Sequence, residues 1–453
     1  MTANIDIPRM EDFNVFPNSG FLPPKLPLER LPQQYYKPWE DIAANLSSLI
    51  LTKRIRSVID TKVPLLDTCH LSCEEEYRRA YQVLGFLAHA YVWGTDTPIN
   101  KLPPQIAQPW IEVSRYLRLP PIATYAGLCL WNFKQIIPTE EGKDIWDLDN
   151  LTTINTFTGS IDESWFYLVS VYFEHKGALS INTGLEAIKC AHNNDIPGLV
   201  SQLQQLAEAI DVLGSVLMKM EEMCDPHVFY FRIRPYLAGW KNMADVGLDK
   251  NGVLYGEEAQ PRSYSGGSNA QSSLIQFLDI LLGVKHYSTG ERPLAFKEAP
   301  QAGPENGFMN EMRTYMPGPH QDFLNKVYEA TNIHDFVLKN ADTHPELVLS
   351  YDACLAMLKS FRDKHIQIVT RYVVLQAKKA NTMGSSTTLR SGLARKKKNG
   401  GEEKGTGGTS LLPFLKQCRD ETGDPAAGNW GKRILSDGVM RLKYSKPNGI
   451  NED

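Results

Sequence analysis

The chain has 453 residues, of which 42% are hydrophobic and 22% are charged, so it can bury a large core and exceeds one average domain. Its 48 basic and 52 acidic side chains leave a net charge of -4. This near balance argues against binding to nucleic acid or to an anionic membrane surface, and it favours a small ligand.

The N-terminal sequence MTANIDIPRMEDF has no basic stretch followed by an apolar one, so we expect neither a secretory nor a transit signal. The longest apolar stretch, YQVLGFLAHAYVWG, is too short to cross a bilayer. Seven scattered cysteines without a CxxC pair suit reduced thiols, which predicts a cytoplasmic protein. Cys69, His70 and Cys73 lie close together, but their spacing fits no established zinc pattern.

The first part of the chain predicts an arm followed by short helices. Residues 1–40 are rich in proline, which indicates an extended arm on the surface. Residues 38–61 and 74–93 place apolar side chains at helical spacing, and short helices between paired prolines continue to about residue 135. We expect a small helical N-terminal domain (1–140) and a large helical domain (141–453).

The second part predicts longer helices and few strands. Helical runs are expected at 163–193, 195–224, 272–285, 305–316, 320–329 and 346–377. Alternating strand patterns bounded by tight turns are few, so the predicted fold class is all-α. The polar stretch 378–404 is rich in glycine and lysine, which predicts a mobile loop.

One histidine lies on an apolar helical face. Between Tyr351 and Tyr372 apolar residues recur at spacings of three and four, and His365 falls on that face. A buried imidazole either hydrogen-bonds inside the core or offers a nitrogen to a ligand, and spacing leaves both alternatives open. Arg362 adds a cation one turn earlier. A porphyrin would use both, because its iron takes imidazole and its propionates take guanidinium partners.

A second stretch, YSGGSNAQSSLIQFLDILLG, predicts a glycine turn followed by a helix, with Ser268 and Gln271 at capping-box spacing. The backbone amides of such a start can bind a carboxylate or a phosphate, although an ordinary helix cap explains the spacing as well. Asp279 in the following helix is either a surface residue or a buried acid that pairs with a cation such as Arg362.

Two aromatic stretches leave similar alternatives. In SWFYLVSVYFEH, Phe166 and Ser170 share a helical face, which is either an ordinary core face or the wall of a pocket for a flat aromatic ligand. In HVFYFRIRPYLAGWK, Arg234 follows several aromatic residues, which favours either a stacked ion pair or a carboxylate clamp. GTGGT at 405–409 lacks the lysine and the strand of a phosphate-binding loop, and its position after the polar stretch is compatible with a flexible lid.

Together these stretches resemble the indoleamine 2,3-dioxygenase family, haem enzymes that open the indole ring of tryptophan. The resemblance runs from LPPIATYAGLCLWNFK to GTGGTSLLPFLKQCRDET, and its markers are YLAGWK, GGSNAQSS, RTYMPGPH, SFRDKHIQIVTRY and GTGGT in a shared order. It implies an all-α, haem-binding catalytic domain with haem b, ferrous when active. The implied reaction adds dioxygen across the C2–C3 bond of L-tryptophan and gives N-formylkynurenine, the first step towards NAD.

The resemblance also implies residue roles. His365 corresponds to the proximal ligand of the haem iron, Arg234 to the arginine that holds the substrate carboxylate, and Ser170 to the distal-side serine. The other correspondences are the substrate-binding positions Tyr125, Phe166, Tyr167, Phe229 and Thr406 and the haem-supporting positions Ser268, Asp279 and Arg362. Tyr167 and Tyr230 stand where a phenylalanine can occur, and Leu128 where a cysteine can.

The family further implies an electron donor that keeps the iron reduced, a monomer, and no nucleic-acid or membrane partner. Two alternatives remain. The first is a low-activity, haem-binding member that has a regulatory role or acts on another indole. The second is a helical scaffold without a cofactor, which a colourless and iron-free preparation would favour.

Overall fold

A computed structural model describes residues 7–140, 145–289, 307–382, 393, 405–406 and 410–436. Helices dominate these residues, which confirms the predicted all-α class. The strands are two residues long: β1 (Lys101–Leu102) pairs in parallel with β4 (Leu254–Tyr255), and β2 (Lys134–Gln135) pairs antiparallel with β3 (Leu151–Thr152). No helix in the described ranges has both the length and the apolar character needed to span a membrane.

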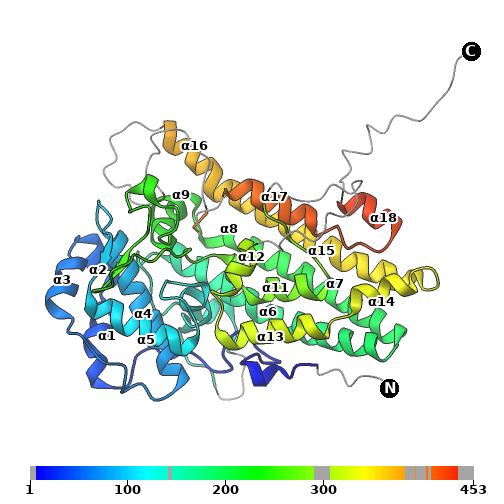
Figure 1. The fold of residues 1–453 in the computed structure, drawn as a ribbon, viewed down its shortest axis with the longest axis horizontal. Coiled ribbons are helices and arrows are strands. Elements are labelled where there is room, and N and C mark those ends of the chain that lie inside the picture. The colour runs from blue at the N-terminus through cyan, green and yellow to red at the C-terminus, as the bar shows by residue number, and fades with distance from the viewer. Residues whose placement is uncertain are drawn as a thin grey trace, which may run out of the picture.

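Short helices gather at one end of the molecule (Figure 1). They are α1 (Lys37–Ala44), α2 (Leu46–Leu51), α3 (Ile55–Lys62), α4 (Glu74–Trp93) and α5 (Pro104–Leu117). The run 38–61 is therefore three helices and not one. The side-chain amide of Asn45 donates to the carbonyl of Asp41 and competes with the helix, and Lys53 adopts a left-handed φ of 56° after α2.

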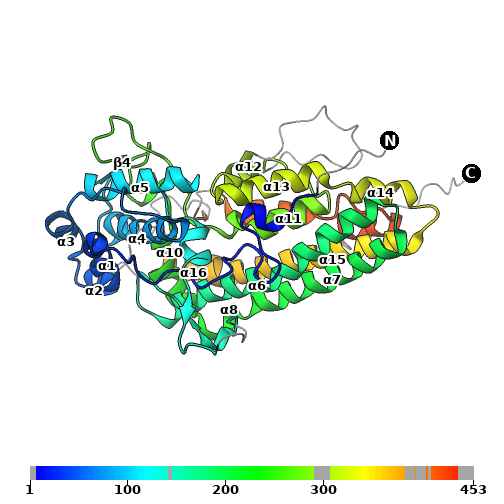
Figure 2. The same ribbon diagram turned by 90° about the horizontal axis from the view of Figure 1, so that it is seen from below.

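Three long helices form the other part of the molecule and lie side by side (Figure 2). They are α6 (Ile161–His192), α7 (Ile196–Met218) and α15 (Pro345–Val369), close to the predicted runs. The α6 helix begins after Ser160, whose hydroxyl accepts a hydrogen bond from the Glu163 amide at 3.3 Å. Asn194 then takes a left-handed φ of 55°, and the Asp195 carboxylate caps α7.

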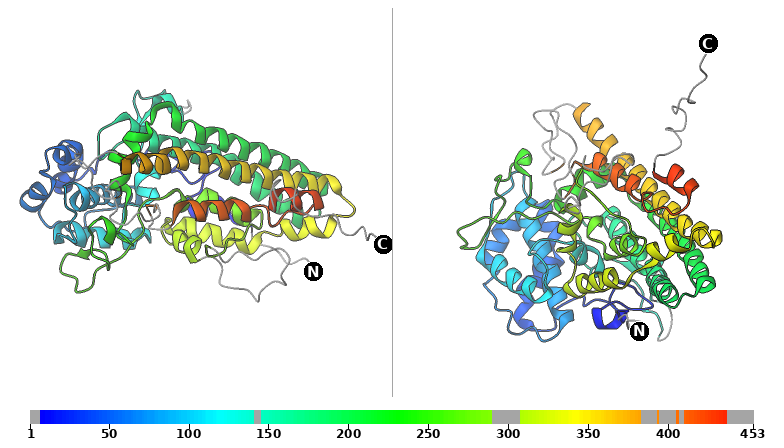
Figure 3. Two further views of the ribbon diagram at one scale, coloured as in Figure 1. Left: turned by 90° about the horizontal axis from the view of Figure 1, so that it is seen from above. Right: turned by 45° about the vertical axis from the view of Figure 1, so that its right-hand side comes forward.

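The remaining helices are distributed over both parts, and α10 lies against α4 (Figure 2). They are α8 (Met220–Met223), α9 (Pro226–Val228), α10 (Arg234–Leu237), α11 (Ser273–Leu281), α12 (Gly307–Arg313), α13 (Gly318–Ala330), α14 (Ile333–Asn340), α16 (Leu375–Thr382), α17 (Leu411–Glu421) and α18 (Asn429–Gly431). The α14 and α17 helices were not predicted. The α17 helix packs along α15, although their sequences lie far apart (Figure 3).

Two glycines let α11 approach α6 closely. A Cβ at Gly177 would lie 2.0 Å from a methyl carbon of Leu274, and a Cβ at Gly184 would lie 2.6 Å from a methyl carbon of Leu281. Both distances are shorter than any contact between non-bonded carbon atoms, so a larger residue at either position would push α6 and α11 apart. The close approach brings α6 side chains within hydrogen-bonding distance of the residues that precede α11.

Two predictions of organisation are not settled by this fold. One hydrophobic cluster contains Leu22, Tyr81, Val171 and Leu393, so buried packing crosses residue 140, and the domain boundary stays a prediction. Residues 378–382 of the predicted mobile loop belong to α16, and apart from Leu393 the rest of that loop lies outside the described residues.

Candidate active site

A cavity of about 260 Å³ lies among α6, α11, α15 and three π-helical turns. The turns are Ala126–Leu130, Phe229–Ile233 and Thr370–Val374, and each contributes lining side chains. A π-helical turn inserts one extra residue into a helix and changes the direction of nearby side chains, and such turns are frequent at functional sites.

The structure brings the predicted site residues together around this cavity. Those that line it are Tyr125, Phe166, Tyr167, Ser170, Phe229, Arg234, Ser268, Arg362, His365 and Thr406. Asp279 does not line the cavity, but its carboxylate accepts a hydrogen bond from Arg362, which does line it. The arrangement joins residues from α6, α10, α15 and the π-helical turn Phe229–Ile233 with residues that precede Ala126, α11 and α17.

Two interior histidines differ in their hydrogen bonding. His89 is fully buried and uses both ring nitrogens: Nε2 accepts from the Ala123 amide at 3.0 Å, and Nδ1 lies 2.7 Å from the carbonyl oxygen of Tyr236. His365 lines the cavity, and no hydrogen bond joins it to the described residues. Burial and the nearby Arg362 cation lower the pKa of His365 to about 4, so its imidazole is neutral at physiological pH. Of these two histidines, His365 is the one that offers a nitrogen to a ligand.

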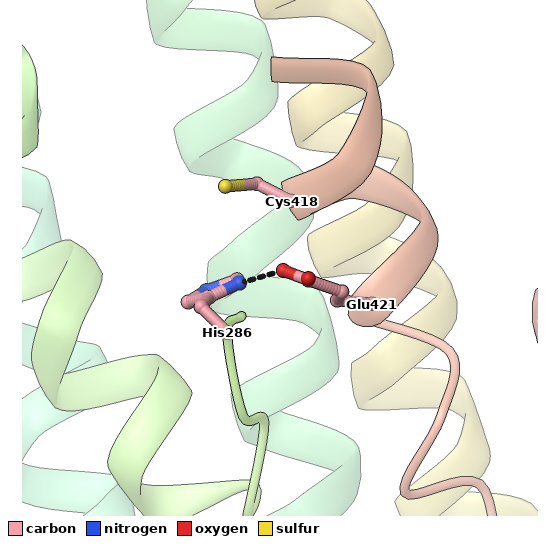
Figure 4. Close-up of side chains that lie close together, drawn as sticks. All are labelled: His286, Cys418 and Glu421. Atoms are coloured by element: carbon pink, nitrogen blue, oxygen red, sulfur yellow. Dashed lines mark hydrogen bonds and ion pairs between the residues drawn. The ribbon is translucent and has the colours of Figure 1, made fainter. Parts of the chain in front are cut away.

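Arg362 is the centre of a buried ionic cluster beside His365. Its Nη2 donates to both carboxylate oxygens of Asp279 at 2.7 Å, and its Nη1 donates to the hydroxyl of Thr422. His286 bridges Asp279 and Glu421, at 3.1 and 2.6 Å (Figure 4 shows the second contact). The alternative that Asp279 lies on the surface is wrong, because its side chain is only 5% exposed.

The charges in this cluster stabilise one another. Burial alone would raise the pKa of Asp279, but Arg362 and His286 outweigh it and hold the pKa below its usual value. Burial alone would lower the pKa of His286, but the charge of Asp279 and the hydrogen bonds that His286 makes to Asp279, Cys418 and Glu421 raise it well above the ordinary value. Arg362 and His286 thus favour the ionised form of Asp279.

Ser268 caps a different element from the one that the sequence predicts. Ser268 caps a 3-10 turn, where its hydroxyl accepts from the Ala270 amide at 3.2 Å, and α11 begins only at Ser273. The Gln271 side chain does not reach back to complete a capping box. It accepts from the Tyr125 amide at 2.9 Å and donates to the Gly266 carbonyl at 2.8 Å, because tertiary contacts hold it there.

Thr406 is docked onto the same segment. Its hydroxyl donates to the Gly267 carbonyl at 2.8 Å, and its own carbonyl accepts from the Gly239 and Gly266 amides at 3.4 and 3.3 Å. The predicted lid 405–409 is described at residues 405 and 406 only. These contacts place Thr406 on the cavity wall.

Aromatic rings form one wall of the cavity. The Phe166 ring lies 5.0 Å from Phe229 and 5.5 Å from Tyr167, in tilted contacts that apolar pockets commonly contain. The Tyr167 hydroxyl donates to Glu163 at 3.1 Å. The Ser170 hydroxyl bonds weakly to the Phe166 carbonyl of its own helix at 3.4 Å. The wall is therefore apolar with one small hydroxyl.

Arg234 is a buried cation on this apolar cavity. Its side chain is 2% exposed, and its guanidinium carbon lies 5.2 Å from the centre of the Tyr230 ring. Its Nη1 donates a long hydrogen bond of 3.5 Å to the carbonyl of Leu393. Because Arg234 follows a π-helical turn at the start of α10, its backbone position is fixed by two helical segments.

A carboxyl group that sequence reasoning missed lies behind Tyr125. Glu174 is one turn after Ser170 on α6, and its Oε1 accepts from the Tyr125 hydroxyl at 3.0 Å and from the Ser272 hydroxyl at 2.6 Å. Its Oε2 has no hydrogen-bond partner among the described residues. Burial raises the pKa of Glu174 to about 7. The helical spacing from Ser170 was the only sequence signal for it.

The chain is similar to known proteins over most of its length. The family model for indoleamine 2,3-dioxygenase matches residues 9–425. The chain belongs to the indoleamine 2,3-dioxygenase family. It is 46% identical over 92% of its length to the indoleamine 2,3-dioxygenase of Saccharomyces cerevisiae, and the match covers 93% of that protein.

Two other relatives widen the range of named activities. The chain is 36% identical over 91% of its length to the 6-hydroxytryptophan 2,3-dioxygenase of Fusarium equiseti, covering 96% of it. It is 33% identical over 91% of its length to indoleamine 2,3-dioxygenase 2 of Homo sapiens, covering 94% of it. Members of the indoleamine 2,3-dioxygenase family are haem-dependent oxidoreductases, and 2,3-dioxygenation of tryptophan is the family activity.

In this member of the family, sequence reasoning also missed the ionic cluster. His286 is buried and bonded to Glu421, 135 residues away. No local pattern could reveal a pair at that separation. The Asp279–Arg362 pair, by contrast, was one of two alternatives at the sequence level, and the structure confirms the contact.

Proposed function

We propose that this enzyme binds haem b through His365 and adds dioxygen across the C2–C3 bond of L-tryptophan to give N-formylkynurenine. The single observation that carries the proposal is the unbonded, neutral imidazole of His365 on the wall of an apolar cavity that also contains the buried Arg234 cation. A ring nitrogen for iron and a cation for a carboxylate are the two polar groups that this reaction needs.

The residues around the cavity fit a haem group. His365 would supply a nitrogen to the haem iron, and Arg362, held by Asp279, would present positive charge beside it. Ser268 and the amides near it would receive a propionate. Ferrous haem supplies the binding and activation of dioxygen. The aromatic wall formed by Phe166, Tyr167 and Phe229 would exclude water from the cavity.

The substrate would be held by charge at one end and by packing at the other. Arg234 would bind the amino-acid carboxylate in a two-pronged, charge-assisted contact. Phe166 and Phe229 would pack on the indole ring and hold C2 and C3 in a reactive position. Thr406, docked on Gly267, would close the cavity on the side of the carboxylate. Both atoms of dioxygen end in the product, so no external proton donor is required for balance.

Another indole is the second candidate, because a named relative acts on 6-hydroxytryptophan. The contacts of Tyr167 favour the unsubstituted ring, since its hydroxyl donates to Glu163 and the neighbouring wall residues Phe166 and Phe229 are apolar. A ring hydroxyl would then lose its hydrogen bonds to water without replacement. We expect kcat/KM for tryptophan to exceed that for 6-hydroxytryptophan by about tenfold or more. A higher kcat/KM for 6-hydroxytryptophan than for tryptophan would favour the hydroxylated compound as the substrate.

The haem assignment is tested with His365→Ala. The wild-type protein should show a Soret band and form N-formylkynurenine, and the variant should lose both. Added imidazole should restore the Soret band, because it can enter the space that the side chain leaves. His344→Ala is the matched control, since His344 is paired with Glu346 at the surface. A normal haem spectrum in His365→Ala without imidazole would refute the assignment of His365 as the ligand of the haem iron.

We also propose that the protein acts in the cytoplasm as a monomer, with an electron donor that reduces the iron. Sedimentation of the haem-loaded protein measures its mass and tests the proposal that it is a monomer. Restoration of activity by a reductant, after oxidation of the iron, tests the need for a donor.

A further inference from the structure

Three side chains with metal-binding atoms converge beside the cavity (Figure 4). They are His286, in the segment after α11, and Cys418 and Glu421, which are three residues apart on the last turns of α17 and so share one helical face. The donor atoms lie within 4.8 Å of one another. Exposure is 8% for His286 and Cys418 and zero for Glu421.

We propose that His286, Cys418 and Glu421 form a site for one transition-metal ion, with Zn²⁺ as the preferred ion. Imidazole nitrogen, thiolate sulfur and carboxylate oxygen are the three donor types that zinc binds in proteins. Three protein ligands leave the fourth position of a tetrahedral ion for water or another small ligand. His286 and Cys418 both line the cavity, so that position faces it.

Neighbouring groups hold the donors in the orientation that a metal requires. Asp279 lies 3.1 Å from His286 Nε2, which leaves Nδ1 directed at Glu421. A carboxylate that binds the second ring nitrogen of a histidine is a usual partner of metal-bound imidazole. The Tyr287 amide and the Gln417 side chain donate to Glu421 Oε1 at 3.1 and 2.7 Å, which leaves Oε2 for the ion.

The size of the site requires only a small movement. Metal bonds of about 2.0–2.3 Å at tetrahedral angles place ligand atoms about 3.5 Å apart. His286 Nδ1 and Glu421 Oε2 now lie 2.6 Å apart, and no pair exceeds 4.8 Å. Each separation therefore changes by roughly 1 Å, which side-chain rotation can supply.

The exchange of protons for metal keeps the charge of the cluster. One proton leaves His286 Nδ1 and one leaves Cys418 Sγ as a divalent ion enters, so the net charge is unchanged. Asp279 and Arg362 keep their own pair. The ion would also tie α17, which follows the Thr406 segment, to the chain that follows α11.

The test measures zinc on the full-length, haem-loaded protein. Equilibrium dialysis against Zn²⁺ with a weak chelator, followed by elemental analysis, gives zinc per chain, and zinc-edge X-ray absorption gives the ligands without interference from iron. We expect about one zinc per chain with one sulfur at about 2.3 Å. Cys418→Ser should remove the sulfur contribution, and Cys418→Ser, His286→Gln and Glu421→Gln should each lower bound zinc at least about tenfold.

Matched controls separate this site from surface binding. Cys190→Ser removes a partly exposed cysteine of α6, and His344→Gln removes a surface histidine that pairs with Glu346, so both should bind zinc like the wild type. Circular dichroism and the Soret band verify that each variant folds. A wild-type protein that takes up no zinc would overturn the proposal, as would undiminished uptake in both Cys418→Ser and His286→Gln.

Discussion

Glu174 gives a quantitative prediction about pH and stability. Burial raises the pKa of its carboxyl from 4.5 to about 7, and a tenfold change in acidity corresponds to about 1.4 kcal/mol. Ionising this group in the folded protein therefore costs about 3 kcal/mol. Because the folded protein binds the proton more tightly than the unfolded chain, this stabilisation is complete below about pH 4.5 and is lost as the pH rises through about 7.

The Glu174→Gln variant should remove this pH dependence. Its amide oxygen can still accept from Tyr125 and Ser272, but the side chain no longer ionises. Urea unfolding between about pH 5 and pH 8 should show that the wild type loses about 2.5 kcal/mol more stability than the variant. Infrared spectra should show a protonated carboxyl band that disappears near pH 7 and is absent from Glu174→Gln. Parallel stability profiles of the two proteins, or no such band at pH 5, would refute the reasoning.

Other substitutions have expected outcomes as well. Arg234→Ala should lower kcat/KM for tryptophan about 100-fold while the Soret band remains, and Arg234→Lys should recover part of the loss because it keeps the charge without the planar fork. Arg362→Leu should destabilise the protein by about 3 kcal/mol in urea unfolding, since Asp279 then lacks its arginine partner. Thr406→Ala removes the hydrogen bond to Gly267 and should lower kcat/KM about fivefold in steady-state assays, the equivalent of about 1 kcal/mol. An unchanged kcat/KM in Thr406→Ala would mean that the docked segment has no part in turnover.

Local sequence patterns predicted the helices well where one apolar face repeats without interruption. The starts of the long runs that became α6, α7 and α15 were placed within two residues, because helical periodicity is a local property. The patterns failed where a single residue changes the backbone. Lys53 ends α2 with a left-handed φ, and Gly283 does so shortly after α11, so the predicted helices 38–61 and 272–285 are shorter than expected.

The sequence by itself determined the all-α class and the family, and it marked His365 and Arg234 as candidates, because residue type and order carry that information. Only the tertiary structure decided that His365 is unbonded while His89 is satisfied, since hydrogen-bond partners come from other parts of the chain. The contacts of Glu174 with Ser272 and of His286 with Glu421 likewise join residues 98 and 135 positions apart. Burial and the charges of such distant neighbours set the pKa of each group, and neither can be obtained from local spacing.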